Sequence, residues 1–252
     1  MSKIQRINPS SLSHLPSRIH YLHSFLAFNP STDGPLITSL KPLLAPLLPT
    51  LLDAVYTQLL SYDITARSFL PSQAANTPSQ DAGIDEKDVE ALNLNHANIK
   101  HRKDFLRAYL IRLLSNRDWS PQSRFWEYLD NVGVVHTGQK QTAKKNTLRV
   151  EYVHIALLLG WLQDALVGVV MSVKEDEGDG GWTMERKIEV LRALGKFWWV
   201  QNDLFARHYC EDWDLMGEEK RTGLLERPAV KMTGLAAVGF VTGAIAVAFL
   251  LG

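Results

Sequence analysis

Apolar side chains recur at the three- and four-residue spacing of an α-helix along most of this 252-residue chain. The sequence shows no run of the strict alternation between apolar and polar residues that is typical of a half-buried strand. Proline residues divide the leucine-rich stretch after residue 35, because proline lacks an amide donor and favours a helix start or a break. The pattern predicts an all-α protein with helices over residues 17–28, 36–44, 47–61, 91–115, 121–136, 149–173 and 183–209.

The helix over 149–173 is apolar on most of its faces. Such a helix has to be covered on two sides, so it either occupies a central position or contributes to a dimer contact. The helix over 183–209 starts after Thr183, a good capping residue, and contains the aromatic run Phe197-Trp198-Trp199.

The helix over 17–28 holds two histidines, His20 and His23, and has an apolar set at helical spacing: Ile19, Leu22, Phe25 and Leu26. Three residues apart on a helix, the two imidazoles would be able to approach one metal ion. No third ligand is near them in the sequence, so we expect both to lie at the surface.

Polar segments separate and flank these helices. Residues 71–90 contain too little apolar surface to offset their ordering entropy, which predicts a mobile loop insertion. A basic loop follows His136, and a charged, glycine-rich linker precedes Trp182. Residues 1–16 form an N-terminal extension and residues 211–231 a charged linker.

Residues 232–252 contain no charged side chain. A helix of this length would extend about 31 Å at ~1.5 Å per residue, close to the hydrocarbon thickness of a bilayer. The alternative, a core helix, would need a partner covering it on every side. We expect a single C-terminal transmembrane helix that acts as a tail anchor, and Arg227 and Lys231 before it predict a cytosolic location for the preceding domain.

Composition limits the possible partners. Lys and Arg total 27 and Asp and Glu total 27, so no net charge favours nucleic acid. The single cysteine, Cys210, excludes an intramolecular disulfide framework and a cysteine-built zinc site, and it fits a reducing compartment. The N-terminus has no apolar run typical of a secretory signal. The predicted location is therefore an intracellular membrane.

Two side chains are candidates for binding. His136 ends an aromatic and apolar helix, where a neutral imidazole would be able to ligate a metal or haem iron, or where its charge would favour the helix dipole. Tyr56 lies in the middle of an apolar helix face, so its hydroxyl needs a partner, either a backbone carbonyl or a bound ligand. His154, within a continuous apolar helix, is interpreted as a satisfied core residue.

Three segments, Tyr128-Leu-Asp-Asn-Val-Gly-Val-Val-His136, Leu148-Arg-Val-Glu-Tyr-Val-His-Ile-Ala156 and Gln201-Asn-Asp-Leu-Phe-Ala-Arg-His-Tyr209, resemble the protoglobins, the globin type shared with globin-coupled sensors. The resemblance covers residues 17–210. It implies a globin-like three-over-three helical sandwich holding haem b, with an extra N-terminal helix matched by residues 17–28. No signalling domain follows the globin part of this sequence.

The resemblance also implies roles for single residues. His136 matches the proximal iron ligand, and Tyr56 matches the distal tyrosine whose hydroxyl binds the gas ligand. Phe105 matches the distal aromatic residue, with Tyr109 one turn away as the alternative. The helices over 149–173 and 183–209 match those that form a four-helix homodimer interface in the family.

These features predict a globin that reversibly binds oxygen, carbon monoxide or nitric oxide at a membrane surface, as a gas sensor or carrier. One alternative is a redox enzyme such as a nitric oxide dioxygenase, which would need a reductase partner because the sequence has no flavin or nicotinamide fingerprint. The other is a tail-anchored helical adaptor without a cofactor. A role without catalysis is favoured.

Overall fold

The computed structural model describes residues 4–70, 86–138, 149–175 and 182–210. All of them fall within one compact unit, residues 1–217. A single β-bridge joins Thr137 to Arg149, and the described residues contain no strand. The helices are η1 (Pro9–Ser13), α1 (Leu15–Leu26), α2 (Asp33–Thr38), α3 (Lys41–Leu44), α4 (Leu48–Leu60), α5 (Asp63–Ala66), η2 (Arg67–Phe69), α6 (Glu86–Glu90), α7 (Ala97–Leu114), α8 (Arg124–His136), α9 (Tyr152–Ser172) and α10 (Met184–Ala206).

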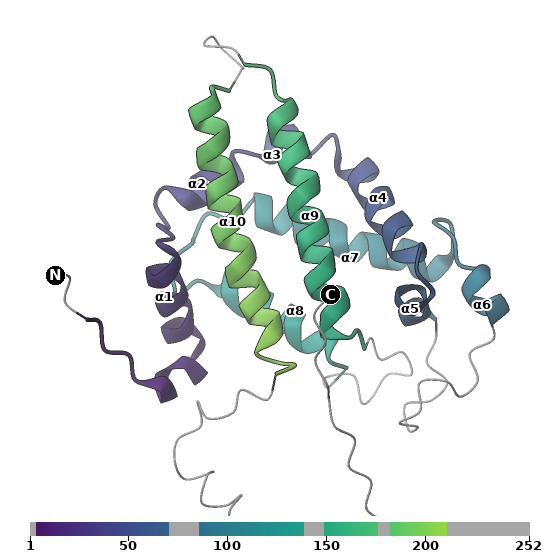
Figure 1. Ribbon diagram of the computed structural model, residues 1–252, viewed down its shortest axis with the longest axis horizontal. Coiled ribbons are helices and arrows are strands. Elements are labelled where there is room, and N and C mark those ends of the chain that lie inside the picture. Colours follow the sequence, from purple (N-terminus) through teal and green to yellow (C-terminus); the bar gives the residue numbers. More distant parts are fainter. Residues whose placement is uncertain (1–3, 71–85, 139–148, 176–181, 211–252) are drawn as a thin grey trace, which may run out of the picture. The chain divides into compact units, whose positions relative to one another are not determined.

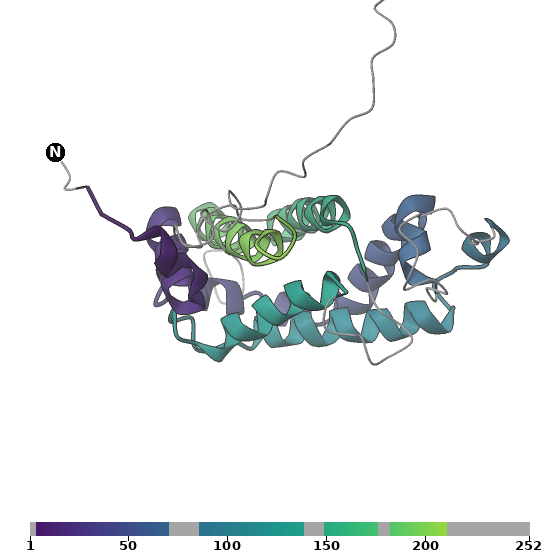
Figure 2. The same ribbon diagram turned by 90° about the horizontal axis from the view of Figure 1, so that it is seen from below.

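The long helices lie in two layers. Helices α9 and α10 lie side by side, with α1 beside α10 (Figure 1). Helices α7 and α8 run beneath this pair, and α4 packs against α7 (Figure 2). The all-α architecture expected from the periodicity is therefore confirmed for the described residues.

Helix α10 is the central helix, since it packs against α9, α8, α2 and α1. It contributes the longest set of buried apolar side chains, which is Val190, Ala193, Leu194, Phe197, Trp198, Val200, Leu204 and Phe205. Phe197 meets the rings of Trp119, Phe125 and Trp126 from the chain around α8. These aromatic contacts join the two layers through α10.

Helix α9 is covered by the described chain on one side only. It buries His154, Ile155, Leu162, Leu166 and Val170. Its other face exposes Val153, Leu157, Val167 and Met171. By length and composition α9 would be able to cross a membrane, but it packs along α10 within the helical unit.

Several predicted boundaries differ from the structure. The helix expected over 36–44 is broken at Ser39 and Leu40 into α2 and α3. The helix expected from residue 91 begins at Ala97, where the His96 ring accepts a hydrogen bond from the amide of Asn98. Residues 86–90, expected to be loop, form α6, next to the buried side chain of Leu92. The remainder of that loop and the predicted tail, 232–252, lie outside the described residues.

The surface position expected for His23 is wrong. His23 is 5% exposed and packs against the rings of Phe28 and Trp126, whereas His20 is exposed as predicted. Phe25, assigned to the apolar face, is exposed. His23 lies one turn after Ile19, which is fully buried, and so shares its inward face.

Candidate functional site

The site is built on the C-terminal end of α8. The side chain of Ser123 caps the helix by accepting a hydrogen bond from the amide of Phe125, 3.2 Å away. The sequence predicted that this helix starts at Pro121, and the structure starts it three residues later, at Arg124. At its other end the carbonyl of His136 accepts a 3.0 Å hydrogen bond from the amide of Val150, which ties His136 to the start of α9.

The geometry of the His136 ring fixes which nitrogen is free. Its Nδ1 lies 2.7 Å from the carbonyl oxygen of Val132. A carbonyl only accepts hydrogen bonds, so Nδ1 carries the proton and Nε2 keeps its lone pair. Burial lowers the pKa of His136, which favours the neutral imidazole that a metal requires. The ring of Phe205 meets the imidazole edge to face, with centroids 5.4 Å apart.

A close helix crossing holds α8 in place. A Cβ atom on Gly133 would lie 2.6 Å from the carbonyl oxygen of Leu204 in α10 and 2.9 Å from Cδ2 of His208. Beside it, the carboxylate of Asp130 accepts hydrogen bonds from Nε2 of His208 at 2.8 Å and from Arg207 at 3.3 Å. Only glycine allows this approach, so Gly133 sets the distance of His136 from α10.

Tyr56 is placed by α4. It is 6% exposed, and its ring packs against Phe69 at 5.6 Å between centroids. No residue in the described part of the chain forms a hydrogen bond with its hydroxyl. Burial raises the pKa of Tyr56, so the hydroxyl keeps its proton and can donate it to a partner.

The two candidate distal aromatic residues on α7 differ in environment. Phe105 is 58% exposed and meets the ring of His101. Tyr109 is partly buried, and its hydroxyl donates a 3.1 Å hydrogen bond to Oε1 of Gln201 in α10. Burial raises the pKa of Tyr109 as well. Tyr109 therefore faces the interior of the described chain, and its hydroxyl already has a partner.

Arg102 on α7 is a half-buried cation that the sequence did not single out. Its charge opposes the effect of burial on the pKa of Tyr56, and it adds to the effect of burial on the pKa of His136. One guanidinium therefore acts on both residues, although they belong to α4 and α8. A charge on the helix face that carries Ile99 and Leu106 is the sequence signal that would have identified it.

Two other polar side chains are enclosed by the helices. Gln201 is fully buried and was not recognised as a site residue in the sequence. His154 is buried, as predicted, but it is not satisfied. Its Nε2 lies 3.6 Å from a carboxylate oxygen of Glu151 and has no hydrogen-bond partner among the described residues.

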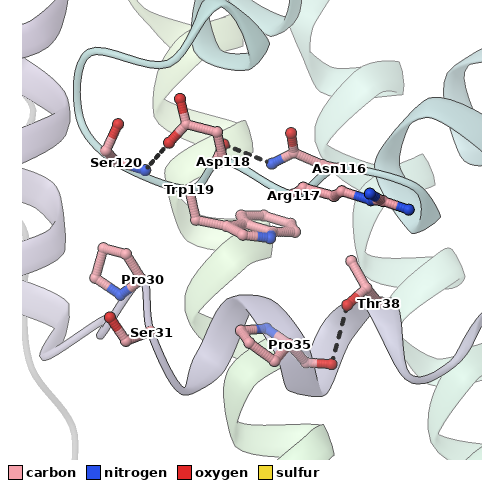
Figure 3. A pocket seen from close by; sticks show the side chains of 9 residues that line it. All are labelled: Pro30, Ser31, Pro35, Thr38, Asn116, Arg117, Asp118, Trp119 and Ser120. Carbon is pink, nitrogen blue, oxygen red and sulfur yellow. Dashed lines mark hydrogen bonds between the residues drawn. The ribbon is translucent and has the colours of Figure 1, made fainter.

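Two surface clefts lie away from these residues. One, of about 460 Å³, is lined by Pro30, Pro35, Thr38 and the loop 116–120. Figure 3 shows the Trp119 indole between this loop and Pro35, with Asp118 bonded to the amide of Ser120. The other cleft lies between the 31–36 segment and α10. Neither cleft is lined by Tyr56, Tyr109 or His136, so we assign neither to the candidate site.

The chain was compared with known proteins. A search of curated proteins gave no significant match. Among solved structures, the globin domain of a globin-coupled sensor from Geobacter sulfurreducens is similar, with 15% sequence identity and a TM-score of 0.49 over 76% of this chain and 97% of that domain. A profile of the Protoglobin family matches residues 15–214. This match spans most of the sequence, including every described helix from α1 to α10, so the chain belongs to the Protoglobin family, and membership of a globin family implies haem binding.

Proposed function

We propose that this protein holds haem b through His136 and reversibly binds a diatomic gas, either oxygen, carbon monoxide or nitric oxide, at a membrane surface. It acts there as a gas sensor or carrier. The observation that carries the proposal is the 2.7 Å hydrogen bond from Nδ1 of His136 to the carbonyl of Val132. This bond leaves Nε2 as a free nitrogen donor in a chain of a globin family.

The residues present fit a haem group. A haem site needs one neutral nitrogen donor beside an apolar cavity, and His136 lies against Phe205. Tyr56 adds a buried hydroxyl whose partner is not found among the described residues. Nε2 of His136 and the Tyr56 hydroxyl each lack a described partner, which a bound haem and its gas would supply.

Haem iron ligated by one histidine keeps a further coordination position at which a diatomic gas binds. The residues of the chain position this group and its ligand. Val132 fixes the tautomer and the orientation of His136, and Gly133 sets the position of the helix that carries it. With haem bound, Tyr56 would donate a hydrogen bond from its hydroxyl to the gas, and the apolar side chains around it would exclude water.

We infer that the protein is a homodimer through α9 and α10. The outer face of this pair exposes Val153, Leu157, Val167, Met171, Met184, Ile188 and Trp199. Two glycines of α9, Gly160 and Gly168, have no described atom beyond their own helix backbone within 4 Å of a Cβ position. Glycine destabilises a helix interior by roughly 1 kcal/mol, and close approach of a partner helix would offset that cost. Residues 232–252 attach the domain to the membrane in this proposal.

An absorption spectrum tests the proposal directly. The full-length chain, purified in detergent and supplied with haem, should show a Soret band that shifts when the reduced protein is exposed to carbon monoxide. The His136→Ala chain should lose this band, because it lacks the nitrogen donor. The His154→Ala chain should keep it, since His154 lies on α9 against Glu151. A wild-type chain that remains colourless with haem present would disprove the proposal.

A further inference from the structure

Two stretches near the start of the chain form one exposed apolar patch. The hydroxyl of Ser24 on α1 donates a 3.3 Å hydrogen bond to Oε1 of Gln5, which holds the first described residues against the outer side of this helix. Their sequence neighbours Phe25 and Ile4 are 76% and 85% exposed, and the ring of Tyr21 lies 6.0 Å from that of Phe25. We call Ile4, Tyr21 and Phe25 the N-terminal patch. Large apolar side chains that gather on one exposed face are typical of a contact with another molecule or a membrane.

The charge around the N-terminal patch is positive. Residues 1–32 contain no aspartate and no glutamate. Arg6 is exposed within the patch segment, and Lys3 precedes it in the sequence. The carboxylate of Asp203, which reaches α1 from α10, is already paired with Arg18 at 2.6 Å. A negatively charged surface with an apolar interior, such as an anionic membrane, therefore complements this face in both charge and polarity.

The C-terminal end of α10 lies beside the same part of the chain. The guanidinium of Arg207, directly after the helix, donates a 3.2 Å hydrogen bond to the carbonyl oxygen of Ser13, two residues before α1 begins. Residues 211–231 continue the chain from this end and lead to the uncharged residues 232–252. A segment of that length spans at most about 75 Å even when fully extended. A membrane that takes up residues 232–252 would therefore be within reach of the N-terminal patch.

We propose that the N-terminal patch, with Arg6 and Lys3 beside it, rests on the anionic lipid surface of the membrane that holds residues 232–252. This proposal rests on the membrane attachment in the proposed function. Aromatic and aliphatic side chains insert at the level of the lipid headgroups, and cations beside them are attracted to anionic lipids. The contact gives the domain one fixed orientation at the bilayer, which an anchor at the end of the chain alone would leave free.

Spin labels on the full-length chain test this orientation. Cys210→Ser removes the exposed native thiol, and His20→Cys then places a nitroxide on the exposed side of α1, one turn before Ser24. Ser172→Cys, at the exposed last residue of α9, provides the control label. The C-terminal ends of α9 and α10 lie at opposite ends of this helix pair, so the control label is far from the exit of α10 (Figure 1).

Each labelled chain is studied in detergent, in vesicles of phosphatidylcholine, and in vesicles that also contain phosphatidylserine. Flotation with the vesicles reports membrane attachment. The accessibility of the nitroxide to a water-soluble nickel chelate, measured by electron paramagnetic resonance, reports whether lipid covers the label. Far-ultraviolet circular dichroism reports folding.

With phosphatidylserine present, the α1 label should be protected from the chelate and the α9 label should stay accessible. Phe25→Ser and Ile4→Ser should each reduce this protection. Arg6→Gln should lower the ratio of protected to accessible label about fivefold, the effect of one cation at an anionic surface. Ile64→Ser is the matched control for Phe25→Ser, because Ile64 on α5 is 54% exposed and should not touch the membrane. All these variants should still float, since they keep residues 232–252.

A chain that floats while its α1 label is as accessible as its α9 label would overturn the proposal and leave the membrane attachment intact. Equal protection in both kinds of vesicle would overturn the role of anionic lipid. Protection of the α1 label in detergent would also overturn the proposal, because the acidic residues 211–219 or a second copy of the chain would then cover the patch. A chain that floats with neither kind of vesicle would overturn the membrane attachment as well.

Discussion

The Nδ1 atom of His136 donates a 2.7 Å hydrogen bond to the carbonyl oxygen of Val132, one turn earlier in α8. The imidazole is thereby oriented by the backbone of its own helix rather than by a side chain from another element. Any displacement of α8 moves Nε2 by the same amount. The contacts that hold α8 against α10 therefore control the position of the proposed iron ligand.

Gly133→Ala is expected to disturb this position. The new methyl would meet the carbonyl of Leu204 at 2.6 Å, and backbone atoms cannot move aside as a flexible side chain would. We expect a loss of about 1–3 kcal/mol in the free energy of unfolding, together with weaker haem binding. Denaturant unfolding and haem titration of the full-length chain measure the two effects.

Gly195→Ala is the control for Gly133→Ala. A Cβ at Gly195 meets no described atom beyond its own helix backbone within 4 Å, and alanine favours a helix over glycine. The variant should be as stable as wild type or more stable by up to about 1 kcal/mol. If Gly133→Ala were as stable as Gly195→Ala and bound haem normally, the close crossing of α8 and α10 would not determine the site.

The two interior tyrosines should respond differently to loss of their hydroxyls. The hydroxyl of Tyr56 has no partner in the described chain, so Tyr56→Phe should leave stability nearly unchanged and raise the oxygen dissociation rate about tenfold. Tyr109→Phe removes the partner of Gln201 and should cost about 1–3 kcal/mol of stability with little change in that rate. Flash photolysis and stopped-flow mixing measure the rates. An unchanged rate in Tyr56→Phe would contradict a role for its hydroxyl in gas binding.

Periodicity predicted most of the architecture and the inward position of two site residues. His136 and Tyr56 lie on strongly apolar helix faces, so burial followed from their own helices. The helix ends were less predictable, because several capping residues compete. Ser120-Pro121 resembles a helix start, yet Ser123 supplies the hydrogen bond that begins α8.

The roles of the remaining polar residues could not be predicted, because they depend on which helices pack against each other. Gln201 differs little in sequence from an ordinary polar residue of α10, and only the position of α7 brings Tyr109 to it. Arg102 likewise gains its significance from Tyr56 and His136, which lie on two other helices. The sequence predicted a surface position for His23 because histidine is seldom fully buried. The Trp126 ring that covers it is distant in sequence, so the pattern of the first helix could not reveal it.

His23 should make the stability of the chain depend on pH. Burial lowers its pKa from 6.5 to about 4, with a smaller effect in the same direction from His20 and an opposing one from Asp33. The unfolded chain therefore takes up a proton below pH 6.5 that the folded chain does not bind until about pH 4. Its contribution to stability is present above pH 6.5 and is lost as the pH falls towards 4.

The shift corresponds to at most about 3 kcal/mol between these limits. His23→Leu should flatten the fall in the free energy of unfolding over this range by about that amount, measured by denaturant unfolding at a series of pH values. His20→Gln is the control, since His20 is exposed on the same helix and its loss should leave most of the slope. A slope that is identical in His23→Leu and wild type would show that His23 does not account for it.

The outer face of α9 and α10 provides the last prediction. Leu157 is 66% exposed and Trp199 is 62% exposed. Large apolar side chains gathered on one exposed face are typical of a surface that a partner covers. Leu157→Glu places a charge on this face and should convert the dimer into a monomer in detergent, as measured by sedimentation. Ile64→Glu, at an exposed apolar position on α5, should leave the dimer intact. Because the globin core is not altered by Leu157→Glu, the monomer should still bind haem, whereas a dimer that persists would place the contact elsewhere in the chain.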